Sequence, residues 1–371
     1  MNPAELLRRS VLGVGPYVPG AGARELKART GRTDLIRLNW NENLLGPLDG
    51  VLDAVTASLP DTVWAYPEAA YEEFRVAVAH WAGADPAQVI PGHGIQALTV
   101  SLVTALVELG DRVVIPRPTY GLYASVCAVA GAELIRVETN PDTLDFDLAA
   151  LARKAREVDA KLVFVCDPNN PTGLRVGRRE WDAFVASLPD RCLAVVDEAY
   201  ADYIEPTDRI DRLVEIDAGR PVVVLRTFSK IFGLAGLRLG YLLAHESLAP
   251  HLHAVQEPFN VNCAALAAGL ASLERVEQLP ARRAQAARAR ERLIAPLVGA
   301  GIRTLGSHAS FVLVQVGGDD VAVCEALARQ GFLLRAGSEF GLPGYVRVTI
   351  GDEELMDRVA DELVRAVTAA R

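Results

Sequence analysis

Lysine is scarce in this chain. Only four lysines (Lys27, Lys154, Lys161 and Lys230) accompany 34 arginines among the 371 residues. Arginine cannot be deprotonated in a protein, so chemistry that needs a neutral amine is restricted to these four positions. The formal net charge is −9. An acidic chain of this kind argues against a nucleic-acid surface as the main functional feature.

Other signals are also absent. The five cysteines are scattered and form no C-x-x-C pair, which excludes a recognisable disulfide framework or zinc site and favours a reducing, cytoplasmic setting. The first 20 residues lack the apolar core of a signal peptide, and no run of 18 uncharged apolar residues predicts a membrane span. The six histidines form no metal-binding motif, so we expect no metal centre.

Apolar segments rich in Val and Ile alternate with helical segments through most of the chain, which predicts an α/β fold with a mostly parallel sheet. Expected strands occupy 111–118, 133–138, 161–166, 192–197 and 221–227, and a strand-like segment at 88–92 leads into a helix over 95–110. From about residue 274 the pattern changes to a long Arg- and Ala-rich helix, short strands and a final helix. We therefore expect a large domain over 36–270, a small α+β domain over 271–371, and an N-terminal arm over 1–35 that partly joins the small domain.

Chemically distinctive residues follow several of the predicted strands. Asn170, Asp197, Tyr200 and Lys230 each lie at or just past a strand end. In sheets of this class, ligands bind beyond the carboxyl ends of the strands, so we expect these side chains to meet in one crevice.

Lys230 differs from the other lysines because apolar residues flank it in "LRTFSKIFGLAGLRLGY". A lysine at a strand end can simply extend its ammonium group to solvent. It can also be an amine with a lowered pKa that forms a Schiff base. Ser229 and Arg238 favour the second interpretation, because a hydroxyl and a guanidinium suit a phosphate next to the amine.

A second element that suits an anion is the turn "PGHGIQAL" at 91–98. It places the backbone N–H groups of Ile95 and Gln96 at the start of a helix, where anions bind readily. The turn alone is also compatible with any glycine-rich connection between a strand and a helix. It lacks the third glycine of a dinucleotide-binding fingerprint.

Asp197, expected at the buried end of a strand, needs a cationic or hydrogen-bonding partner. A protonated pyridine nitrogen is one such partner, and an arginine or a helix N-terminus is another. Tyr200 could donate to a phenolic oxygen. Asn170 lies in "NNPTG", which is also the composition of a plain β-turn.

Taken together, these segments resemble the fold-type I aminotransferases that use pyridoxal 5′-phosphate (PLP). The resemblance rests on "DPNNPTG" (167–173), "DEAYADY" (197–203) and "LRTFSKIFGLAGLRLGY" (225–241). The histidinol-phosphate aminotransferase branch is matched in order and spacing by "PYVPG" (16–20), "NENLLGP" (41–47), "YPEAAYEEFR" (66–75), "PTYGLY" (118–123), "PFNVN" (258–262) and "YVRVTIG" (345–351). Departures from the usual family pattern are Leu44, His93 and Gln96, in place of proline, asparagine and an acidic residue.

The resemblance implies a role for each matching residue. Lys230 would bind PLP covalently and transfer the proton. The other implied cofactor contacts are Asp197 at the pyridine nitrogen, Asn170 and Tyr200 at the 3′-oxygen, Tyr120 on the ring, and Ile95, Gln96, Ser229 and Arg238 at the phosphate. The implied substrate contacts are Tyr17, Asn43, Arg335 and Arg347. Tyr66 would reach the cofactor of a second subunit, which implies a homodimer with shared active sites.

The expected reaction is transamination between histidinol phosphate and 2-oxoglutarate. The same scaffold also resembles aminotransferases that act on phenylalanine or tyrosine. A third relative is the threonine-phosphate decarboxylases, which share the segment around Lys230 and the "FGLPGYVRV" segment (340–348). The resemblance leaves these alternatives open.

Overall fold

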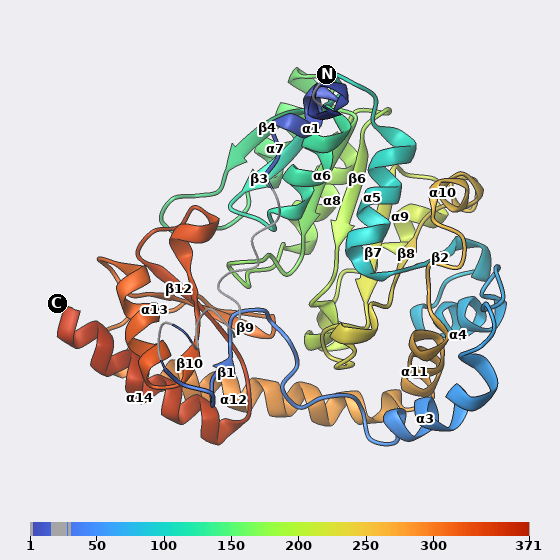
Figure 1. Cartoon of the computed structure of the whole chain (residues 1–371). Helices are drawn as coiled ribbons and strands as arrows, with labels where there is room; N and C mark the ends of the chain where they lie inside the picture. Colours follow the sequence, from blue (N-terminus) through green and yellow to red (C-terminus); the bar gives the residue numbers. More distant parts are fainter. Residues whose placement is uncertain (1–2, 16–27, 29–30, 371) are drawn as a thin grey trace.

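The computed structural model describes residues 3–15, 28 and 31–370 of the chain. A seven-stranded mixed sheet organises the larger unit (Figure 1). In spatial order its strands are β2 (Val89–Gly92), β8 (Gly240–Leu243), β7 (Val222–Thr227), β6 (Leu193–Asp197), β5 (Leu162–Cys166), β3 (Arg112–Arg117) and β4 (Glu133–Glu138). Only β8 runs antiparallel to its neighbours. The prediction of an α/β fold with a mostly parallel sheet is confirmed.

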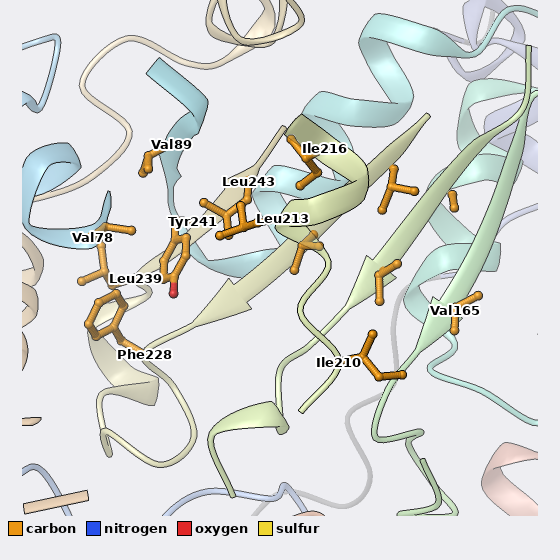
Figure 2. Close-up of a cluster of buried hydrophobic side chains, with 14 of the residues drawn as sticks. Val78, Val89, Val165, Ile210, Leu213, Ile216, Phe228, Leu239, Tyr241 and Leu243 are labelled. Carbon is orange, nitrogen blue, oxygen red and sulfur yellow. The ribbon is translucent and has the colours of Figure 1, made fainter. Parts of the chain in front are cut away.

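Both faces of this sheet are covered, which explains why its strands are almost continuously apolar. Along β5, Val163 and Val165 join the core on one face, whereas Leu162 and Phe164 join the core on the other. Figure 2 shows part of the first core, in which Val165 lies in the same cluster as Tyr241 and Leu243.

Different helices pack against the two faces. The first core includes buried side chains of α3 (Val51–Thr62), α4 (Glu72–Ala82), α7 (Leu148–Glu157), α8 (Arg178–Ser187), α9 (Leu213–Asp217) and α11 (Cys263–Leu273). The second includes those of α5 (Gly94–Leu106), α6 (Leu122–Ala130) and α10 (Ala249–Val255). The short helix α1 (Arg9–Leu12) lies beside α6, where the Arg8 guanidinium donates to the Val129 carbonyl at 3.1 Å.

The C-terminal unit has its own core. An antiparallel sheet in the order β11 (Arg335–Ala336), β12 (Tyr345–Thr349) and β9 (Phe311–Gln315) packs with α12 (Leu279–Gly299), α13 (Asp320–Arg329) and α14 (Glu353–Ala370). The strand β1 (Ile36–Arg37) pairs in parallel with β10 (Phe332–Leu333). Figure 1 shows α12 running along the base of the molecule from α11 to α14.

Three details differ from the sequence-based expectations or refine them. The helix expected over 95–110 ends at Leu106, because Val107 adopts an extended conformation. The strand β8 was not predicted; it is only four residues long and follows a short 3-10 helix (Ala235–Leu237) rather than an α-helix. The boundaries at 35/36 and 270/271 stay predictions, but Leu38 packs in the core of the C-terminal unit. No helix within the described ranges is long and apolar enough to span a membrane.

Candidate active site

A cavity of about 760 Å³ opens where the carboxyl ends of β5, β6 and β7 face the C-terminal unit. Its lining combines residues that are up to 332 positions apart in the chain, from Gly15 to Arg347. Of the predicted site residues, it brings together Ile95, Gln96, Tyr120, Asn170, Asp197, Tyr200, Ser229, Lys230, Arg238, Arg335 and Arg347. The crevice expected at the strand ends is therefore present.

Lys230 follows β7, and its side chain reaches across the cavity. Its Nζ donates to the carbonyl oxygen of Asn41 at 2.9 Å and lies 5.4 Å from the centre of the Tyr200 ring. Burial and, next, the positive charge of Arg347 lower the pKa of the Lys230 amine to about 8. An amine with this pKa supplies a substantial neutral fraction near physiological pH, as nucleophilic and basic chemistry requires.

Asp197 ends β6 and is only 3% exposed. One carboxylate oxygen accepts from the Tyr123 hydroxyl at 2.6 Å, and the other accepts from the backbone N–H of Ala199 at 3.0 Å. Burial raises the pKa of this carboxyl group. Because both of these donors are neutral, the carboxylate can still stabilise a cation that enters the cavity.

Arg347 links the two units at the wall of the cavity. Its guanidinium donates to the Asn170 carboxamide oxygen at 2.6 Å and to the Asn39 carbonyl at 2.7 Å. It also lies over the Phe311 and Phe340 rings, 5.4 and 5.8 Å from their centres. The bond to Asn170 fixes which end of that carboxamide is the acceptor, and leaves its NH₂ group as the donor end.

A second set of groups suits an anion. The helix α5 begins at Gly94, and a Cβ atom added to that glycine would lie 2.7 Å from an Nη atom of Arg238. Glycine therefore permits the guanidinium to approach the helix N-terminus. The Thr227 and Ser229 hydroxyl oxygens, 3.0 Å apart, line the same part of the cavity. Helix N–H groups, hydroxyls and a guanidinium together fit a phosphate dianion.

The remaining cations lie on the wall formed by the C-terminal unit. Arg335 and Arg347 are direct partners on the antiparallel strands β11 and β12. The Arg335 guanidinium pairs with Glu339 at 3.2 Å, and the Glu339 side chain is 41% exposed against 15% for Arg335. The two arginines form a second place where an anion can be held from both sides.

Two of the predicted site residues that the structure describes, Tyr66 and Asn43, do not line the cavity. Tyr66 is 83% exposed and stacks on Phe259, with ring centres 4.7 Å apart. The Asn43 side chain is used locally, because its nitrogen donates to the Ile231 carbonyl at 2.9 Å and its oxygen accepts from the Leu45 N–H at 3.1 Å. Asn41 lines the cavity and Asn43 does not, so the assignment of Asn43 to the substrate stays a prediction. Tyr17 lies outside the described residues.

Sequence reasoning also missed Tyr123, the hydroxyl partner of Asp197, and Glu339, the acidic partner of Arg335. Tyr123 is the last residue of "PTYGLY" and Asn41 the first of "NENLLGP", so both stood inside segments that already carried the resemblance. The order of residues in these segments does not indicate which side chains turn inward. Glu339 carried no comparable signal.

Comparison with known proteins agrees with this geometry. Residues 33–363 match the model of the family "Aminotransferase class I and II". The chain is 37% identical over 362 residues to the histidinol-phosphate aminotransferase of Symbiobacterium thermophilum, covering 97% of this chain and 98% of that protein. It is 35% identical over 345 residues to the enzyme of the same name from Moorella thermoacetica, covering 93% and 88%.

Solved structures give the same result. Histidinol-phosphate aminotransferase from Sinorhizobium meliloti, in complex with pyridoxal-5′-phosphate, is similar with a TM-score of 0.91 and 28% identity, over 99% of this chain and 98% of that one. The match confirms the fold-type I architecture. From the extent of these matches, the chain belongs to the aminotransferase class I and II family.

Proposed function

We propose that the protein binds PLP and transfers an amino group from histidinol phosphate to 2-oxoglutarate. The observation that carries the proposal is the meeting, in one cavity, of the Lys230 amine with two separate anion-binding groups. Arg238 with the N-terminus of α5 forms one, and the register-paired Arg335 and Arg347 form the other. A phosphorylated cofactor and a phosphorylated donor would need both.

The chain's own residues fit PLP at each of its polar groups. Lys230 would be the amine for its aldehyde, and Asp197 the buried carboxylate for its pyridine nitrogen. Asn170 and Tyr200 would donate to its phenolic oxygen, and its phosphate would be held by Ser229, Arg238, Ile95 and Gln96. When bound, PLP supplies an electron sink for the electron pair left by cleavage of the substrate's Cα–H bond.

Lys230 then serves as the proton carrier. Its lowered pKa allows the free amine to accept the proton that leaves the substrate's Cα. Asp197 would place a carboxylate beside the cofactor's ring nitrogen, and Tyr123 orients that carboxylate by donating to it. This proton transfer would be efficient only if the substrate is held so that the Cα–H bond stands perpendicular to the cofactor ring.

Arg335 and Arg347 provide that orientation. A guanidinium can donate two parallel hydrogen bonds to a phosphate or to a carboxylate. Arg335 and Arg347 would therefore hold the phosphate of histidinol phosphate together, and Arg347 would also hold a carboxylate of glutamate in the other half-reaction. The names of the Symbiobacterium and Moorella relatives support this donor. Aromatic amino acids and threonine phosphate are the competing substrates of the same scaffold.

A homodimer with shared active sites completes the proposal, together with a cytoplasmic location. Tyr66 and Phe259 support the dimer, because they form a stacked aromatic pair that is largely exposed in the single chain. Large exposed aromatic groups are typical of surfaces that are covered by a partner. Sedimentation at nanomolar concentration tests this part, since a fully active monomer would contradict it.

A donor panel tests the function. Histidinol phosphate, phenylalanine, tyrosine, leucine and threonine phosphate are each offered with 2-oxoglutarate, while glutamate formation and carbon dioxide release are followed in parallel. We expect the highest kcat/KM for histidinol phosphate and no carbon dioxide. A far higher kcat/KM for an aromatic donor, or carbon dioxide from threonine phosphate, would replace the proposed substrate.

A further inference from the structure

Asn41 contacts two residues of the site at once, although nothing in its sequence position assigns it a role. Its backbone carbonyl accepts from Lys230 Nζ at 2.9 Å, and its side-chain nitrogen donates to the Tyr200 hydroxyl oxygen at 3.0 Å. Asn41 is 1% exposed and has a φ of 56°. This left-handed conformation is tolerated by asparagine, aspartate and glycine but is strained for most residues.

The orientation of the Asn41 carboxamide follows from its other neighbour. The Thr349 hydroxyl oxygen accepts from the Asn41 backbone N–H at 3.0 Å and lies 3.3 Å from the carboxamide oxygen. In this arrangement the Thr349 hydroxyl donates to the carboxamide oxygen of Asn41. The NH₂ end of Asn41 then faces Tyr200 and donates to its hydroxyl oxygen.

The same reasoning fixes Tyr200. A tyrosine hydroxyl has one proton and can accept at its lone pairs. Since Asn41 donates to its oxygen, the Tyr200 proton is left to donate to another group, and Tyr200 lines the cavity. Asn170 is ordered in an equivalent way, because Arg347 occupies its oxygen and leaves its NH₂ group as the donor.

We propose that Asn41 is a positioning residue that directs the Tyr200 hydroxyl proton into the cavity, so that Tyr200 and Asn170 both donate to one anionic, phenolate-type oxygen of the ligand. The inference rests on the proposed function, in which that oxygen belongs to PLP. Hydrogen bonds to a charged acceptor are stronger than those between neutral groups, so the direction of one proton has a measurable effect.

The absorbance of the PLP-loaded protein reports on this oxygen independently of turnover, because donors to it stabilise its anionic form and lower the pH at which the bound chromophore titrates. The test variant is N41D, which keeps the shape of the side chain and tolerates the positive φ. Its carboxylate accepts the Tyr200 proton instead of donating to the hydroxyl oxygen. We expect the titration midpoint to rise by about 1 pH unit or more, the size of one charge-assisted hydrogen bond.

The new carboxylate of N41D also acts through its charge. The control is therefore N41D combined with Y200F, which removes the hydroxyl group. The other titratable or charged groups facing Tyr200 are Arg347, Asp197, Lys230 and Cys166. These residues are unchanged in every protein of the double-mutant cycle of Asn41 and Tyr200. We expect Y200F to raise the midpoint and N41D to add little in that background. N41G, which also tolerates the positive φ, should shift the midpoint in the same direction by less, and covers the case in which N41D does not fold.

The outcomes separate the two hypotheses. A wild-type protein that forms no chromophore with PLP would refute the proposed function and this inference with it. A wild-type chromophore whose midpoint is unchanged in N41D or N41G would overturn the inference alone. So would an N41D shift of equal size in the Y200F background, since the effect would then be that of charge.

Discussion

Asp197 and Glu198 are adjacent carboxylates, each only 3% exposed, in opposite electrostatic settings. Asp197 receives hydrogen bonds from Tyr123 and a backbone N–H, and burial raises its pKa. Glu198 pairs with Arg212 and with Arg226, the latter at 2.7 Å. Although burial acts to raise the pKa of Glu198, these two guanidinium groups hold it below its usual value.

The surroundings of Glu198 form a balanced network. Arg212 also bonds Asp167 at 2.5 Å, and Asp167 accepts from the Val176 N–H at 3.0 Å, so two arginines and two carboxylates join the loop after β5 to the ends of β6 and β7. Buried ions are stable when they are paired and hydrogen-bonded in this way. The charges of this network need no external partner. We therefore infer that the network supports the cavity.

The positive and negative charges that line the cavity are not equal in number. Four cations (Lys230, Arg238, Arg335 and Arg347) and three acids (Glu42, Asp197 and Glu339) line it. A cavity with excess positive charge favours the entry of dianions. The comparison teaches that a compensated carboxylate marks structural support, whereas a carboxylate with only neutral partners marks a place for a cationic ligand group.

Removing the amine should produce the largest effect on the cavity. Lys230→Ala should reduce transamination by several orders of magnitude, because it removes both the covalent attachment point and the base. Borohydride reduction of the PLP-loaded wild type, followed by peptide mapping, should label Lys230. Lys154→Ala is the control, since Lys154 forms a local pair with Glu157 at 2.6 Å. A label on Lys154 or Lys161 would contradict the assignment.

Substitution of Asp197 should lower activity, whereas substitution of Glu198 should lower stability. Asp197→Asn should lower kcat by ~10²–10³-fold, the usual effect of removing one preorganised electrostatic partner. Its free energy of unfolding at pH 7 should not fall, because burial disfavours the ionised carboxylate that is removed.

Glu198→Gln should mainly lower the free energy of unfolding. It leaves Arg212 and Arg226 without their shared counter-ion, which costs about 3–5 kcal/mol of stability for a broken buried pair. Urea denaturation measures the stability of both variants and steady-state kinetics their activity. Equal losses of stability in the two variants would remove the distinction drawn between the neighbouring carboxylates.

Much of this arrangement was predictable from sequence because parallel strands present their carboxyl ends at one edge. Asn170, Asp197 and Lys230 follow three such strands, so the pattern alone placed them together. Glu198 and Arg212 gave no such signal: their pairing joins a strand end to a residue before a short helix. Asn41 and Asn43 are two residues apart in one motif, and their spacing does not indicate that Asn41, in a left-handed conformation, is the one that lines the cavity.

The Arg335–Glu339 pair should give a smaller and more selective effect. Arg335→Ala should weaken histidinol phosphate relative to glutamate by about 1.5–3 kcal/mol in kcat/KM, the size of one charge-assisted contact. Arg347→Ala should weaken both substrates, because it is assigned to both anions. Glu339→Gln is the matched variant, and should improve binding of the phosphorylated donor because Arg335 no longer has a competing carboxylate. Equal losses for both substrates in Arg335→Ala would end its assignment to the phosphate.

The finest comparison concerns the pKa of Lys230 itself. Burial and Arg347 lower that pKa to about 8, while Asp197 acts to raise it. The uptake of PLP by the cofactor-free protein requires the neutral amine, so its rate should rise with pH through about 8 in the wild type.

Arg347→Met removes a positive charge that disfavours the ammonium form, so the pKa should rise and the profile should move to higher pH. Asp197→Asn removes a negative charge that favours the ammonium form, so the profile should move to lower pH. Arg358→Met, on α14 at the Phe332 ring, is the control and should leave the midpoint unchanged. A shift of the Arg347→Met profile to lower pH would show that the charge of Arg347 does not act on the amine as the cavity geometry requires.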